Sequence, residues 1–194
     1  MSVTQSRLFY FDLVTGKMPD KVRPSLKRPL SSMKGMYVDG DAFESLLGEA
    51  DPLVYEFYDM GNPETPQELA FGTSIVYPGK VGEEYFMTKG HFHTILDIAE
   101  VYYCLQGHGL MLMENPEGEV EVQELTPGTA LYVPGRFAHR SINVGTDGPL
   151  VTFFSFRADA GHDYGTIETR GFRRLVVERD AGWTLVDNPR WTQD

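Results

Sequence analysis

From residue 51 onward, short runs suited to strands alternate with breaks rich in Gly and Pro. The run 72–77 ends at Pro78 and Gly79, and the run 120–125 ends at Pro127 and Gly128. Strands are depleted in both residues and turns are enriched in them, so the pattern predicts many short strands with tight connections. Such spacing is typical of an all-β sandwich or barrel. We expect strands at 53–58, 72–77, 84–88, 99–105, 109–113, 120–125, 130–133, 138–144, 150–156, 173–177 and 183–186.

The length of 194 residues suits one globular domain. We expect a single domain over 1–194, with the barrel at about 51–180. Residues 1–40 would form an N-terminal arm that packs on the barrel or on a second subunit. One short helix is predicted between them: Asp41 would cap it, Phe43, Leu46 and Leu47 would form its apolar face, and it would end near Gly48.

The net charge of −11 argues against nucleic acid or an anionic membrane as a partner. A small anionic substrate is still compatible with it, because a metal ion and a few local donors can reverse the potential in a pocket. The single cysteine, Cys104, excludes an internal disulfide and is expected to be a packed thiol. The sequence has neither an apolar run long enough to span a membrane nor a signal-peptide pattern, so we expect a cytoplasmic protein.

Of the five histidines, His91 and His93 lie one residue apart in a predicted strand, so both imidazoles project from one face. Glu100 enters from the next strand, and His139 follows the turn at Pro134. Three imidazoles and one carboxylate leave open positions on an octahedral ion. This set suits Fe(II), Mn(II), Ni(II) or Zn(II) rather than calcium or a closed structural zinc. The alternative is a set of core groups that merely hydrogen-bond to one another, although burying them without an ion is costly.

The order of these residues resembles the two motifs of the cupin family. The first cupin motif has His-x-His, Glu and then Gly, matched here by His91, His93, Glu100 and Gly107. The second is matched by Gly128, Pro134, Gly135, His139 and Asn143. Three features depart from the common pattern: six residues separate His93 from Glu100, Gly135 follows Pro134 directly, and Tyr85 replaces the opening glycine.

A closer resemblance covers almost the whole chain from about residue 51. Residues 88–93, 99–102, 133–134, 138–140, 158–167 and 186–191 are similar to the cupin-type glucose-6-phosphate isomerases, which are best known from archaea. The long gap before Glu100 is normal in that family. The resemblance implies a cupin double-stranded β-helix, or jelly-roll barrel, with extra N- and C-terminal strands. It also implies a metal-dependent homodimer that interconverts glucose 6-phosphate and fructose 6-phosphate in glycolysis and gluconeogenesis, with Fe(II) as the expected ion.

Site residues follow from the same resemblance. The matched metal ligands are His91, His93, Glu100 and His139. The matched phosphate and sugar contacts are Tyr55, Ser74 (a threonine in well-known members), Thr88, Gly90, Tyr102, His162 and Tyr164. One departure concerns Arg157, because the chain has Phe156-Arg157 where the family carries Tyr-Pro. Arg157 either replaces the missing hydroxyl with a charged phosphate donor or faces solvent.

Aldose–ketose isomerisation moves a proton between C2 and C1 while charge develops on oxygen, so it needs a base and an electrophile. Glu100 is the candidate base for a path through a cis-enediolate. Tyr102 shares its strand face and could donate to a sugar oxygen, and His162 could shuttle a proton in ring opening. A hydride shift is the rival path.

Three other functions fit parts of the pattern. An Fe(II) cupin dioxygenase would use the same ligands, and a non-catalytic sugar-binding cupin would use the same barrel. An isomerase acting on mannose 6-phosphate would share the whole site. Outside the site, Lys89 is expected to point outward into solvent, and His108 is expected to be an exposed turn residue.

Overall fold

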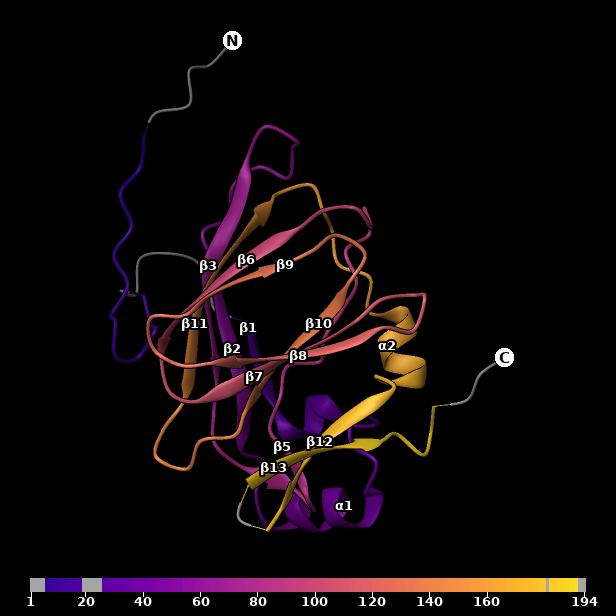
Figure 1. The fold of residues 1–194 in the computed structure, drawn as a ribbon. Coiled ribbons are helices and arrows are strands. Elements are labelled where there is room, and N and C mark those ends of the chain that lie inside the picture. The colour runs from indigo at the N-terminus through magenta and orange to yellow at the C-terminus, as the bar shows by residue number, and fades with distance from the viewer. Residues whose placement is uncertain (1–5, 19–25, 181, 192–194) are drawn as a thin grey trace.

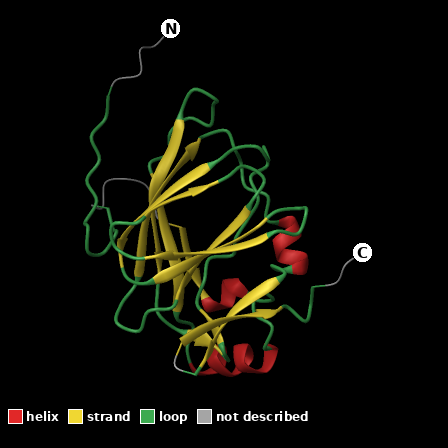
Figure 2. Ribbon diagram, in the orientation of Figure 1, coloured by secondary structure: helices red, strands yellow, loops and turns green. Residues whose placement is uncertain are grey.

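The computed structural model describes residues 6–18, 26–180 and 182–191. Antiparallel strands dominate it, and the helices lie outside the strand framework (Figure 2). The strands are β1 (Leu26–Pro29), β2 (Leu53–Asp59), β3 (Leu69–Val76), β4 (Lys80–Val81), β5 (Glu84–Tyr85), β6 (Glu100–Gln106), β7 (Gly109–Glu114), β8 (Val120–Leu125), β9 (Ala130–Val133), β10 (Ala138–Asn143), β11 (Leu150–Arg157), β12 (Arg174–Arg179) and β13 (Gly182–Asp187).

Two of the three sheets face each other. The larger has the strand order β1-β2-β3-β11-β6-β9, and the three-stranded sheet β10-β7-β8 lies opposite it (Figure 1). A third sheet, β13-β12-β5-β4, lies at one end of this pair beside the first helix. Neighbours such as β3 and β11 are far apart in sequence, so the chain crosses repeatedly between sheets. The expected all-β double-sheet barrel with added terminal strands is therefore confirmed.

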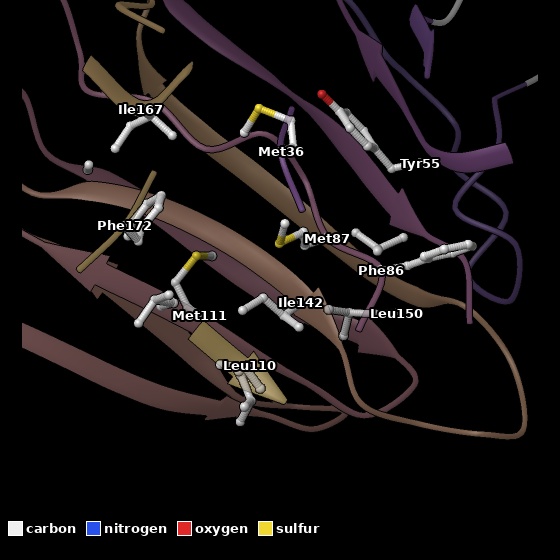
Figure 3. Packing of buried hydrophobic residues seen from close by; sticks show 14 of the residues in the cluster. Met36, Tyr55, Phe86, Met87, Leu110, Met111, Ile142, Leu150, Ile167 and Phe172 are labelled. Carbon is white, nitrogen blue, oxygen red and sulfur yellow. The ribbon is translucent and has the colours of Figure 1, made fainter. Parts of the chain in front are cut away.

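Strand alternation decides which side chains enter the space between the sheets. In β6, Glu100, Tyr102 and Cys104 are buried, whereas Val101 and Tyr103 are exposed. The prediction of a packed thiol at Cys104 is thus confirmed. Away from the polar site the barrel is filled by apolar side chains, of which Figure 3 shows Phe86, Met87, Leu110, Met111, Ile142 and Leu150 gathered in one cluster.

The helices differ in two respects from the sequence prediction. The first, α1 (Gly40–Glu49), is capped by Asp39 rather than Asp41: the Asp39 carboxylate accepts a 2.9 Å hydrogen bond from the Ala42 N–H. A second helix, α2 (Gly165–Arg170), was not expected, because a six-residue helix is too short to display an apolar period. A 3₁₀ turn at Leu30–Met33 follows β1.

The predicted strand at 84–88 is shorter than expected, since β5 ends at Tyr85. The chain continues alongside β10 through isolated bridges that pair Met87 with Ile142 and His91 with His139. Between these bridges the chain advances four residues on one side and three on the other, so one residue is extra. The segment before the His pair therefore contains a β-bulge.

The bulge lies at Lys89 and Gly90. Gly90 has a φ of 77°, which favours glycine, and a Cβ there would lie 2.7 Å from the Phe172 ring. On the opposite strand, Arg140 donates hydrogen bonds from Nε and Nη2 to the Lys89 carbonyl at 3.2 and 2.6 Å. A buried guanidinium on the neighbouring strand thus stabilises the bulge.

The N-terminal arm packs on the outer face of the large sheet. The Phe9 ring lies edge-on to Phe71 at 5.4 Å, and the Phe11 ring lies edge-on to Phe153 at 5.8 Å. The arm's later residues form β1, which pairs with β2, while 19–25 of the predicted basic stretch lie outside the described residues. No helix in the described part of the chain is long and apolar enough to span a bilayer.

Candidate active site

A cavity opens between the two facing sheets. Of the residues proposed from sequence, it brings together Tyr55, Ser74, Thr88, Gly90, His91, Glu100, Tyr102, His139, His162 and Tyr164. The wall also contains residues that the sequence analysis missed: Phe57, Asp59, Lys89, Ser141, Phe154 and Phe156. The alternation of β2 could have found Phe57 and Asp59, which follow Tyr55 at two-residue intervals on the same face.

Four of these side chains converge at one point. The ligand atoms of His91, His93, Glu100 and His139 all lie within 4.8 Å of one another. Glu100 opens β6, His139 lies in β10, and the histidine pair follows the bulge, so three separate segments contribute to the cluster. Glu100 is 2% exposed and His139 is 2% exposed, which leaves bulk water little access to the four groups.

The donor atoms are arranged as a metal site requires. The Nδ1 atom of His93 lies 2.8 Å from the Ile98 carbonyl, and that of His139 lies 3.2 Å from the Phe137 carbonyl. A proton on Nδ1 that is donated to a carbonyl leaves Nε2 with a free lone pair, the usual state of a ligating histidine. The residues present therefore fit a divalent ion.

The remaining atoms of the cluster lack partners of their own. The buried Nε2 atoms of His91, His93 and His139, together with Oε2 of Glu100, form no hydrogen bond with any described residue. The Glu100 oxygen does lie 2.9 Å from Nε2 of His139 and 3.3 Å from that of His93, but without hydrogen-bond geometry. Buried polar groups without hydrogen bonds carry a desolvation penalty, which a bound ion would remove.

Burial and mutual charge set the protonation of the cluster. Burial, followed by the neighbouring His139 and His162, lowers the pKa of His91 well below its ordinary value. Burial would raise the pKa of Glu100, but His139 and His93 hold it below its usual range, so this group stays a carboxylate. Burial and the Glu100 charge raise the pKa of Tyr102, whose hydroxyl therefore remains a donor.

An aromatic wall covers one side of the cluster. The His162 ring lies 4.4 Å from that of His91 and 5.5 Å edge-on from that of Phe156. The Tyr164 ring stacks on His162 at 5.9 Å. Both residues come from the segment before α2, whose backbone pairs with the His91–His93 segment through a bridge from Phe92 to Asp163. This pairing explains why the two segments meet in space.

Lys89 is placed differently from its prediction, and Arg157 lies as in one of the two alternatives left open for it. Lys89 does not extend into solvent: its side chain is 15% exposed, and Nζ lies 2.6 Å from a carboxylate oxygen of Glu168 in α2. The bulge breaks the alternation on which the prediction depended. Arg157 is not among the lining residues of the cavity, and its Nη2 pairs with Asp159 at 3.1 Å. Because Phe156 lines the cavity, the next residue of β11 projects from the other face.

Comparison with known proteins gives consistent matches over most of the chain. The sequence model of the family described as Glucose-6-phosphate isomerase (GPI) matches residues 27–192. A glucose-6-phosphate isomerase from Thermococcus gammatolerans is 48% identical over 181 residues, covering 93% of this chain and 94% of the relative. One from Thermococcus kodakarensis is 47% identical, with 94% of each chain covered. A putative glucose-6-phosphate isomerase 1 from Rhizobium meliloti is 43% identical and is covered over 85% of its length.

Proposed function

Because the chain belongs to the glucose-6-phosphate isomerase family, we propose that it interconverts glucose 6-phosphate and fructose 6-phosphate. The observation that carries the proposal is one cavity that combines a metal-ligand cluster with hydroxyl and amide donors. His91, His93, Glu100 and His139 would hold the ion, with Fe(II) as the first candidate and Mn(II), Ni(II) or Zn(II) as alternatives. When bound, the ion would supply Lewis acidity toward the sugar oxygens.

The phosphate would lie away from the metal ligands, against hydroxyls and the bulge. Tyr55, Ser74, Thr88 and Tyr164 bring hydroxyl groups to the cavity wall, and Gly90 brings backbone without a side chain. The bulge supports this assignment, because it leaves the backbone between Thr88 and Gly90 outside regular strand pairing and open to the cavity. Arg157 is not assigned a substrate role, since Asp159 already pairs with it.

Proton transfer between C2 and C1 would use Glu100 as the base. Its carboxylate is buried and ionised, and Tyr102 follows it on the same strand face. The Tyr102 hydroxyl, which remains protonated, would donate to the oxygen on which charge develops. His162, whose ring lies against His91, would move the proton required for opening the sugar ring.

The substitution Glu100→Gln tests these roles. Loss of the base should lower kcat for fructose 6-phosphate by about 10²–10⁴-fold, the usual contribution of a general base. The matched control is Glu124→Gln, since Glu124 is an exposed carboxylate paired with His108. Activity of Glu100→Gln equal to that of the control would refute the assignment.

Isotope labelling distinguishes the two chemical paths. Loss of the C2 label of deuterated glucose 6-phosphate to water would support the enediolate, whereas full transfer to C1 would identify a hydride shift.

The assembly and location of the protein form part of the same proposal. We propose a single cupin domain that acts as a cytoplasmic homodimer. Exposed apolar residues of the arm, including Leu8 and Leu13, support association with a second copy. Sedimentation at two protein concentrations would test it, and a mass equal to one chain at both would contradict it. No observed feature favours a dioxygenase or a non-catalytic binder over the isomerase.

A further inference from the structure

Arg28 lies beside the cavity although no motif marks it. It stands opposite Tyr55 in the register of β1 and β2, the two neighbouring strands at the edge of the large sheet (Figure 1). Residues that pair directly across two antiparallel strands project from the same face. Tyr55 lines the cavity, so Arg28 projects from the cavity-facing side of the sheet, where it lies behind the lining residues rather than among them. A bulge between Arg28 and Pro29 ends this regular register.

The preceding residue projects from the opposite face. Lys27 pairs with Glu56, and its Nζ lies 3.8 Å from the Glu56 carboxylate. Its side chain is 63% exposed. Two adjacent cations of one strand therefore occupy opposite faces, which makes Lys27 a comparison for the loss of charge at Arg28.

The Arg28 guanidinium has unused capacity to bind an anion. It interacts with the Tyr55 hydroxyl, yet its buried Nε forms no hydrogen bond with any residue that the structure describes. An arginine side chain offers five N–H donors in a planar fork, and a buried donor without an acceptor is unfavourable. Burial raises the pKa of Tyr55 and of Tyr164, and Arg28 opposes the rise in both, so its charge is felt at two hydroxyls of the wall.

A second guanidinium adds to the positive potential at this end. Arg140 is 2% exposed, donates to the Lys89 carbonyl and stacks 4.6 Å from the centre of the Phe172 ring. Both contacts are with neutral groups, while the carboxylates of Glu84 and Glu114 act on its charge from a distance. Its charge also opposes the raised pKa of Tyr55. In a chain with a net charge of −11, two guanidiniums that both act on Tyr55 favour an anion beside this hydroxyl.

We propose that Arg28 binds the phosphate group of the substrate and makes the site selective for phosphorylated sugars. This inference rests on the proposed isomerase function and deepens it. The guanidinium fork matches two phosphate oxygens, the geometry in which arginine binds phosphate most strongly. Arg140 acts as a positioning residue that holds the bulge, whereas Arg28 contacts the phosphate itself. The phosphate keeps this contact in both the bound substrate and the transition state, so the contact changes KM more than kcat.

Steady-state kinetics of Arg28→Gln, Arg28→Lys and Lys27→Gln test the proposal. For Arg28→Gln we expect a KM for fructose 6-phosphate about 10- to 100-fold higher, as for loss of a hydrogen bond to a charged group, with a smaller change in kcat. Arg28→Lys should recover part of the loss, because it keeps the charge but not the fork. Lys27→Gln removes the same charge from the outer face and should leave KM unchanged. Equal KM values for Arg28→Gln and Lys27→Gln would overturn the proposal.

Binding of inorganic phosphate, measured by calorimetry, separates this inference from the isomerase assignment. The unaltered protein and Lys27→Gln should bind phosphate alike, and Arg28→Gln should bind at least 10-fold more weakly. A protein without isomerase activity that shows this order would refute the proposed function and support the anion site. If the protein is active and Arg28→Gln binds phosphate as tightly as the unaltered protein, the isomerase function is supported and the anion site is refuted. Circular dichroism confirms folding, and if Arg28→Gln does not fold, weaker binding by Arg28→Lys than by Lys27→Gln is the deciding comparison.

Discussion

Replacing Asn143 with alanine should destabilise the barrel strongly while leaving the metal ligands in place. Asn143 is fully buried, and its Nδ2 donates to the carbonyls of Val76 and Gly148 at 2.9 and 3.0 Å. Its Oδ1 accepts from the Gly145 N–H at 2.9 Å. Each of the two carbonyls left without this donor would cost about 1–3 kcal/mol, whereas the Gly145 N–H keeps its 3.0 Å hydrogen bond to the His108 carbonyl. Because the 145–148 turn is partly exposed to water, we expect the lower part of that range, about 2–4 kcal/mol in all.

Urea unfolding followed by circular dichroism measures this change in free energy, and the melting temperature should fall by about 4–16 °C for a chain of this size. Asn143→Asp keeps the volume but turns both donating N–H groups into an acceptor, so it should destabilise without creating a cavity. Thr146→Ala, an exposed change in the same turn, is the control. If Asn143→Ala falls within 1 kcal/mol of Thr146→Ala, the account of this buried amide is wrong, the threshold being the net value of about one hydrogen bond.

Two further substitutions and one labelling experiment test other parts of the structure. Gly90→Ala places a Cβ 2.7 Å from the Phe172 ring at a positive φ, so urea unfolding should show a loss of about 2–4 kcal/mol. Burial raises the pKa of Cys104 to about 11, so an aromatic disulfide reagent at pH 8 should label the native chain far more slowly than the urea-unfolded chain. Burial also raises the pKa of Glu84 above 4.5, so the folded chain binds this proton more tightly and stability falls as pH rises through that window. Glu84→Gln should flatten that fall in urea titrations from pH 4.5 to neutrality, and an unchanged slope would contradict the shift.

The regular strands could be predicted because the alternation of buried and exposed residues, and the Gly and Pro residues at strand ends, are local properties of the sequence. The boundaries expected for β8 and β9 match the structure, and in β6 the alternation places Glu100 and Tyr102 inside. The metal ligands could be predicted for the same reason, since two histidines one residue apart in a strand project from the same face. The family resemblance then supplied the residues that no spacing connects.

The errors lie where tertiary contacts override the local pattern. Strand alternation predicts a solvated Lys89, and this prediction is wrong because a one-residue bulge interrupts the alternation. The bulge is bonded to Arg140 on the neighbouring strand, a contact that the sequence does not reveal. The two alternatives for Arg157 stayed open in the sequence because its position depends on the register of β11 at its last residue. Arg28 lies in a segment without motif or period, and only its pairing with Tyr55 brings it to the cavity. Such residues are found from strand register and not from composition.

The central claim is that one divalent ion, held by His91, His93, Glu100 and His139, supports isomerisation in this cavity. The direct test is turnover of fructose 6-phosphate by protein treated with EDTA and then titrated with Fe(II), Mn(II), Ni(II) or Zn(II), with bound metal measured on the same samples. We predict that chelation abolishes turnover and that at least one metal restores it as occupancy approaches one ion per chain. Full turnover in metal-free protein, or none with any metal at full occupancy, would contradict the account.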